Sequence, residues 1–184
     1  MTENVVFIGG TWSGELQEGE TQWWEYWKPT FAKEFCDHSK LIGFSFQWTG
    51  DLKVTRWSWK KPWEKAADRL KWTLMEAHIS RPVIVAHSHG GNVALHALAR
   101  GVECSHLITL GTPPRVGVPT YKGRWTHVVG TRDWTTRFGM LLDGRVSTAT
   151  THKDAHNIVV KKESHSSIRQ ANTWHKHKLW ERVL

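Results

Sequence analysis

Residues 82–91 read Pro82-Val83-Ile84-Val85-Ala86-His87-Ser88-His89-Gly90-Gly91, and this stretch decides the fold. The β-branched apolar run before Ala86 is typical of a strand buried on both faces of a sheet. Apolar residues then recur at helical spacing until Gly101, namely Val93, Ala94, Ala97 and Leu98. Ser88 stands at the junction, with the small residues Ala86 and Gly90 two positions to either side. The stretch therefore predicts a nucleophile elbow, a tight strand-to-helix turn that lifts a serine out of the end of a parallel sheet. The alternative is an ordinary strand and helix joined by a turn that contains a serine.

The rest of the chain alternates strand-like and helix-like segments. Further strands are predicted at Asn4–Ile8, Leu41–Trp48, Ser105–Leu110, Trp125–Val129 and Asn157–Val160. Helices are predicted at about 29–39, 62–78 and 166–179, in addition to the helix after Ser88. This alternation predicts a single α/β domain over residues 1–184. Its sheet is expected to be mainly parallel, with about six strands, helices on both faces and no cap domain.

Two further polar side chains follow predicted strands, where sites form in sheets of this kind. A serine hydroxyl needs a base to activate it, and the base needs an orienting group. On this scaffold the order along the chain is Ser, then Asp or Glu, then His. Asp133 follows the Trp125–Val129 strand, and His165 follows the Asn157–Val160 strand. The sequence therefore predicts a catalytic triad of Ser88, Asp133 and His165.

Other residues compete for these roles. Asp143 is the rival acid, although it lies in a turn-like setting where Asp commonly makes local hydrogen bonds. Among the twelve histidines, His152 and His156 precede the last predicted strand, and His175 and His177 fall on the last helix. These two pairs lack a cysteine cluster or a carboxylate at a metal-binding spacing, so we interpret them as solvated side chains and expect no metal.

An oxyanion hole requires two backbone N–H groups directed at the developing charge. One is expected from His89, directly after the serine. The other is expected from Thr11, after Gly9-Gly10 at the end of the first strand, although paired glycines can also form a simple turn.

Thirteen tryptophans are many for this length, and most are expected to pack in the core. Some are candidates for the wall of an apolar substrate groove: Trp12, Trp23, Trp24 and Trp27.

With these residues in place, the chain resembles the α/β-hydrolase superfamily, and in particular its small, lidless lipase-like and esterase-like members. The resemblance rests on Ala86–Gly91, which fits the pattern Ala-His-Ser-x-Gly-Gly, and on Leu107–Pro113 after the elbow helix. The chain has Gly9-Gly10 where the lipases often have His-Gly. The resemblance implies ester hydrolysis through an acyl-enzyme intermediate, without a cofactor, on a small-molecule or lipid-like substrate.

Composition bounds the remaining alternatives. The net charge is +8 and the pI about 9.7, but the basic residues are spread along the chain, so nucleic acid is not an expected partner. The first predicted strand begins near Asn4, so no ordinary signal peptide is expected, and no apolar run approaches the length of a membrane span. These features predict a cytoplasmic protein. Two cysteines, Cys36 and Cys104, are expected to be free thiols.

Three alternatives to an esterase remain: a binding protein on a hydrolase scaffold, a thioesterase and an acyltransferase.

Overall fold

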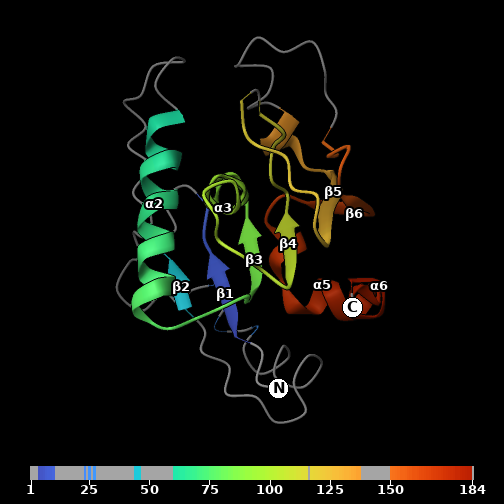
Figure 1. The fold of residues 1–184 in the computed structure, drawn as a ribbon. Helices are drawn as coiled ribbons and strands as arrows, with labels where there is room; N and C mark the ends of the chain where they lie inside the picture. The colour runs from blue at the N-terminus through green and yellow to red at the C-terminus, as the bar shows by residue number, and fades with distance from the viewer. Residues whose placement is uncertain are drawn as a thin grey trace, which may run out of the picture.

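The computed structural model describes residues 4–10, Trp23, Glu25, Trp27, 44–46, 60–115, 117–137 and 150–183. These residues form a parallel sheet with the strand order β2-β1-β3-β4-β5-β6 (Figure 1). The strands are β1 (Val5–Ile8), β2 (Phe44–Phe46), β3 (Val83–His87), β4 (His106–Leu110), β5 (Trp125–Arg132) and β6 (His156–Ser164). β2 is described over three residues only, so the other five strands make up the body of the sheet. The prediction of an α/β fold with a mainly parallel sheet is confirmed.

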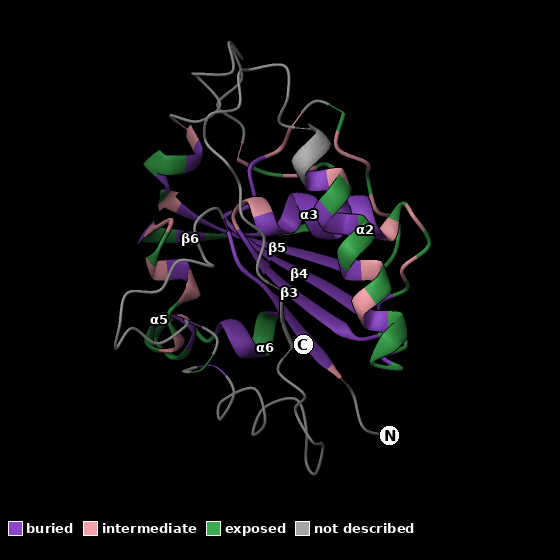
Figure 2. Cartoon of the chain, turned by 90° about the vertical axis from the view of Figure 1, so that its left-hand side faces the viewer, coloured by how far each residue is buried: buried purple, intermediate pink, exposed green. Residues whose placement is uncertain are grey.

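Helices cover both faces of the sheet, as the sequence predicts. On one face lie α2 (Lys60–Glu76) and α3 (His89–Leu98). On the other lie the 3-10 turn η1 (Ser167–Arg169) and the short helices α5 (Ala171–Lys176) and α6 (Leu179–Val183). Figure 2 shows the buried strands between these two groups of helices.

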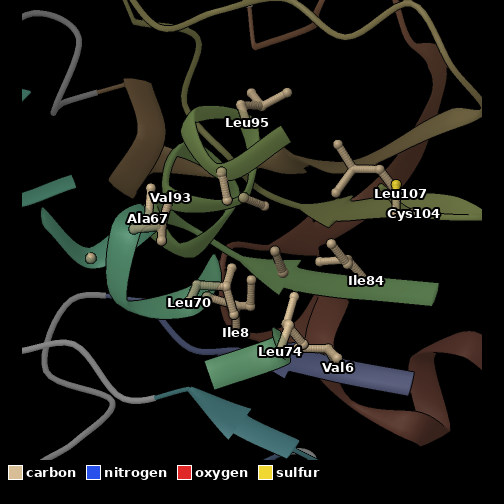
Figure 3. Packing of buried hydrophobic residues seen from close by; sticks show 14 of the residues in the cluster. Val6, Ile8, Ala67, Leu70, Leu74, Ile84, Val93, Leu95, Cys104 and Leu107 are labelled. Carbon is tan, nitrogen blue, oxygen red and sulfur yellow. The ribbon is translucent and has the colours of Figure 1, made fainter. Parts of the chain in front are cut away.

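Side chains alternate between the two faces, because successive residues of a strand point in opposite directions. Val6 and Ile8 pack with Ile84, Ala86 and Leu107 against the helices α2 and α3 (Figure 3). The intervening residues form a second cluster on the α5 and α6 side: Val5, Phe7, Val83, Val85, Ile108 and Leu110. The near-continuous apolar runs of these strands are therefore explained by burial on both faces.

The C-terminal segment differs from the prediction of one helix over residues 166–179. It contains η1, α5 and α6, and two backbone conformations interrupt the helix. Gln170 is extended, with φ −92° and ψ 130°, and Lys178 takes a positive φ of 49°. After each of these two residues the chain turns and buries a large side chain against the sheet. Trp174 follows Gln170 and Leu179 follows Lys178, and both are fully buried. The helix predicted near residues 29–39 lies outside the described residues.

The parallel arrangement places the carboxyl ends of β3, β4, β5 and β6 along one edge of the sheet. The segments that follow these strands are therefore neighbours in space, although they are far apart in sequence. No helix in the described ranges combines the length and the apolar character needed to cross a membrane.

Candidate active site

Ser88 occupies the sharp turn between β3 and α3. Its backbone has φ 55° and ψ −132°, a conformation that costs a residue with a side chain on the order of 1–3 kcal/mol. The Ser88 N–H donates to the Leu110 carbonyl at 2.8 Å, which fixes the turn to the end of β4. A Cβ at position 90 would overlap the carbonyl oxygens of Gly9 and Ile8, so only glycine fits there. The backbone thus has the elbow geometry that the sequence predicts.

Asp133 lies directly after β5 and is fully buried. It begins a helical turn over residues 134–137 and accepts a hydrogen bond from the Thr136 N–H at 2.8 Å, as an N-cap residue does. The Thr136 hydroxyl lies 2.9 Å from the other carboxylate oxygen. These bonds hold the carboxylate in one orientation.

His165 follows β6 and contacts Asp133. Its Nδ1 lies 2.9 Å from Asp133 Oδ2, and its side chain is 11% exposed. A carboxylate can only accept, so Nδ1 carries the proton in this hydrogen bond, and in the neutral form of the ring the lone pair is on Nε2. This is the tautomer that a general base acting through Nε2 requires.

Gly111 allows the close approach of Asp133 and His165. It follows β4 and has a positive φ of 56°. A Cβ at this position would lie 2.9 Å from both Asp133 Oδ2 and His165 Nδ1. The same residue therefore needs glycine both for its backbone conformation and for the space that the pair occupies.

His87 supports His165 from the strand before the elbow. Its Nε2 lies 3.1 Å from the His165 carbonyl oxygen and donates to it, and the two rings are 4.7 Å apart. Burial, followed by the proximity of His165 and Arg169, holds the pKa of His87 well below its ordinary value of 6.5. His87 is therefore a neutral donor that ties the His165 backbone to the end of β3.

His89 begins α3, directly after Ser88. Its ring stacks on Trp63 at 5.2 Å, and its Nδ1 lies 3.1 Å from Asn92 Nδ2. Burial, and then the charge of Arg115 and the proximity of His165, lowers the pKa of His89 to about 3. The ring is thus neutral and fixed in place beside Ser88.

The three residues predicted to form a triad lie at one edge of the sheet, and two of them, Asp133 and His165, are hydrogen-bonded. Within the described residues, no hydrogen bond joins the Ser88 hydroxyl to His165. The elbow and the His165 segment are instead connected through His87, the residue before Ser88, which contacts His165 directly.

The remaining predicted residues have mixed outcomes. Thr11, Trp12, Trp24 and the rival acid Asp143 lie outside the described residues. Trp23 is 8% exposed, and its ring lies 6.1 Å from that of His87, near the site. Trp27 is fully buried against Trp174 and Trp180, with ring centroids 4.7 and 5.4 Å away. Its position therefore differs from the predicted groove wall, because this ring is enclosed in the core.

Two of the histidines interpreted as solvated are engaged in the structure, which corrects that interpretation. His152 is partly buried, contacts the Trp125 ring at 4.7 Å and bonds the Thr112 carbonyl through Nε2. His177 bonds Glu163 at 2.8 Å. In the described part of the chain, no three His, Cys, Asp or Glu side chains gather as metal ligands would.

Sequence analysis did not single out several residues of this site: His87, Thr136, Gly111 and Trp63. Asp133 had a local signal as a preferred helix N-cap residue, but that signal does not identify Thr136 as its partner. The roles of His87, Gly111 and Trp63 depend on contacts between distant segments, which spacing along the chain does not reveal.

No protein-family profile matches the chain, and neither does any curated protein. Solved structures do match over nearly the whole chain. Esterase PE8 is 15% identical with a TM-score of 0.58, covering 100% of this chain and 93% of its own. A structure from the study of carboxylesterases of Nitrososphaera gargenis is 10% identical with a TM-score of 0.63, covering 99% and 90%. The thioesterase RedJ of Streptomyces coelicolor is 11% identical with a TM-score of 0.56, covering 98% and 89%. The chain has the fold of the α/β-hydrolase superfamily.

Proposed function

We propose that this protein is a serine hydrolase that cleaves carboxylic esters through an acyl-enzyme intermediate. One observation carries the proposal: a serine held at φ 55° between a buried strand and a helix shares a sheet edge with an Asp133–His165 pair joined at 2.9 Å. The fold is also that of esterases and other hydrolases. Because fold alone does not give function, the proposal rests on the site.

In the proposed reaction the Ser88 hydroxyl attacks the acyl carbonyl, and Nε2 of His165 takes the hydroxyl proton. His165 then protonates the leaving alcohol, and water hydrolyses the acyl-Ser88 ester by the same proton transfers in reverse. Asp133 keeps His165 in the tautomer with the proton on Nδ1. The backbone N–H groups of His89 and Thr11 are proposed to stabilise the oxyanion. Among the candidate groove residues, we retain Trp12, Trp23 and Trp24.

The test is labelling of the purified protein with a fluorophosphonate probe, together with turnover of 4-nitrophenyl acetate. We expect stoichiometric labelling of Ser88, and loss of both labelling and turnover in Ser88→Ala by several orders of magnitude. Ser88→Ala should keep its circular dichroism spectrum. Near wild-type turnover in this variant would contradict the proposal.

A thioesterase is the second candidate, since one structural neighbour is a thioesterase. In this chain the same three residues, Ser88, Asp133 and His165, would cleave a thioester. Comparing kcat/KM for an acyl thioester with that for the matching oxygen ester separates the two. A non-catalytic binding protein would instead leave Ser88 unlabelled.

A further inference from the structure

Thr136 supplies most of the hydrogen bonds that hold the Asp133 carboxylate. Within the described residues this carboxylate has three hydrogen bonds. Oδ1 accepts from the Thr136 N–H at 2.8 Å, and Oδ2 lies 2.9 Å from both the Thr136 hydroxyl and His165 Nδ1. Rotation of the carboxylate about its Cβ–Cγ bond would lengthen all three. The two bonds from Thr136 therefore fix the orientation in which Oδ2 meets His165.

The Thr136 hydroxyl has one proton, and the distances show where it goes. Two acceptors are within reach, Asp133 Oδ2 at 2.9 Å and the Gly111 carbonyl oxygen at 3.2 Å. The carboxylate is nearer, and a hydrogen bond to an ionised group is roughly twice as strong as one to a neutral group. The hydroxyl therefore donates to Asp133. Its oxygen also lies 3.3 Å from His165 Nδ1, so Thr136 contacts both members of the pair.

The burial of these groups makes the hydroxyl difficult to replace. Asp133 is fully buried, and Thr136 is 3% exposed. Water therefore has no access to the position of the hydroxyl, and a buried acceptor that loses its donor stays unsatisfied. Without the hydroxyl, Oδ2 would be bonded to His165 alone and could turn together with it. The hydroxyl thus connects the pair to the segment after β5.

The backbone and the side chain of Thr136 have separable roles. Any residue other than proline at position 136 would supply the N–H that caps the helical turn at Asp133. Only a side chain with a hydroxyl at this position can also donate to Oδ2. The second bond is therefore a property of the side chain, which the helical turn itself does not require.

The orientation of the carboxylate matters most when charge develops on His165. In the proposed reaction this ring becomes an imidazolium, and a carboxylate already fixed in place stabilises the charge without reorganisation. The neutral ring of the resting protein gains less from the same carboxylate. Loss of the hydroxyl should therefore lower kcat and leave KM nearly unchanged.

We propose that Thr136 is a positioning residue for the Asp133–His165 pair, and that its hydroxyl supports catalysis through this pair rather than through contact with the substrate. The inference rests on the proposed function at Ser88. It adds a fourth side chain to those on which the reaction depends.

The experiment compares kcat and KM for 4-nitrophenyl acetate in the wild type and in variants of position 136. Thr136→Val keeps the backbone N–H and the β-branched shape but lacks the hydroxyl. We expect kcat to fall about tenfold or more and KM to stay within about twofold of the wild type. The rate at which a fluorophosphonate labels Ser88 should fall as well. Thr136→Ser restores the hydroxyl and should bring kcat back to within about threefold of the wild type.

Thr126→Val is the matched control. Thr126 is 4% exposed, and its hydroxyl lies 2.9 Å from His106 Nε2. It lies near the beginning of β5, whereas Asp133 follows the end of that strand. This variant should lose stability in urea denaturation and keep the kcat and labelling rate of the wild type. Thr136→Ala is a second variant without the hydroxyl, for use if circular dichroism shows that Thr136→Val does not fold, and it should show the same loss of kcat.

Three outcomes would show that the inference is wrong: a folded variant without the hydroxyl keeps the kcat of the wild type, Thr136→Ser is no more active than Thr136→Val, or Thr126→Val loses as much kcat. In each case the proposed function stands if the wild type is labelled at Ser88 and hydrolyses the ester. If the wild type does neither, the proposed function fails, and the inference fails with it.

Discussion

Gly111 shows how one residue without a side chain can decide the geometry of this site. Its positive φ lets the chain turn after β4, and the missing Cβ leaves room for the hydrogen bond between Asp133 and His165. Neither residue adjoins Gly111 in sequence. The contact follows from the parallel sheet, which brings the ends of β4, β5 and β6 together.

Replacing Gly111 by Ala should lower both stability and activity. The left-handed backbone costs a residue with a Cβ about 1–2 kcal/mol, and the new methyl would press on Asp133 Oδ2 and His165 Nδ1. We expect a fall of about 1–3 kcal/mol in the free energy of unfolding, together with at least a tenfold loss of kcat with 4-nitrophenyl acetate. Urea denaturation and steady-state kinetics measure the two effects.

Gly101→Ala is the matched control. Gly101 also has a positive φ, 86°, but nothing lies within 4 Å of its would-be Cβ. This variant should lose stability and keep kcat. Equal kcat in Gly111→Ala and the wild type would mean that position 111 does not constrain the pair.

At the scale of elements, hydrogen bonds connect the segment that carries His165 to the end of α5. Glu163, near the end of β6, is 3.0 Å from Lys176 Nζ and 2.8 Å from His177 Nε2. Ser164 and Ser167 hydrogen-bond each other across the turn that holds His165. The position of His165 therefore depends on α5 as well as on the sheet.

Glu163→Gln should lower the free energy of unfolding at pH 7 by about 1–3 kcal/mol, because the charge-assisted hydrogen bond from Lys176 and the hydrogen bond with His177 are both weakened. Hydrogen bonds from His177, Lys176 and Ser167 lower the pKa of Glu163 from 4.5 to about 2. A lowered carboxyl pKa stabilises the folded state above the unfolded value of 4.5, and this contribution is lost as the pH falls toward 2. The difference between wild type and variant in urea denaturation should therefore narrow at pH 3.

The control for this element is Glu103→Gln. Glu103 pairs with Arg81 at 3.9 Å, and both side chains are more than two-thirds exposed, at 76% and 70%. Such surface pairs contribute little, so this variant should unfold like the wild type at both pH values. If Glu103→Gln lowered the free energy of unfolding as much as Glu163→Gln, the effect would follow from removing any carboxylate, and the specific role assigned to Glu163 would be wrong.

At the scale of the molecule, several histidines are buried in the neutral form. His127 is fully buried between Thr109 and the Thr150 carbonyl, and burial lowers its pKa to about 3. Burial also lowers the pKa of His106 to about 4. In the unfolded chain these histidines have the ordinary pKa of 6.5. As the pH falls, the unfolded chain therefore becomes protonated at these positions before the folded protein does.

The protein should be acid-labile well above the pKa of its carboxylates. Its stability should be full above pH 6.5 and fall as the pH decreases from there toward 4 and 3. At pH 5, each such buried histidine lowers the free energy of unfolding by about 1–2 kcal/mol. Urea denaturation at pH 8, 6.5 and 5 measures the slope, and His127→Gln should make it shallower. A free energy of unfolding that is constant from pH 8 to pH 5 would contradict the prediction.

The parts that could be predicted from sequence are those set by local pattern. The apolar runs before Ala86 and Gly111 are buried strands, and the residues after each strand are brought to one edge, as expected for a parallel sheet. The break of the C-terminal helix at Gln170 and the enclosure of Trp27 could not be predicted in this way. Both depend on which distant surface is present to bury an aromatic ring.

The strand order has a consequence for synthesis on the ribosome. Val5 pairs with Val83, so β1 lacks its inner neighbour until residue 83 has been made. β2 arrives earlier, but a pair of strands alone is marginal in water. At translation rates of about 5–20 residues per second, the apolar β1 waits on the order of ten seconds for β3. The nascent N-terminal strand is thus a segment that chaperones would have reason to shield.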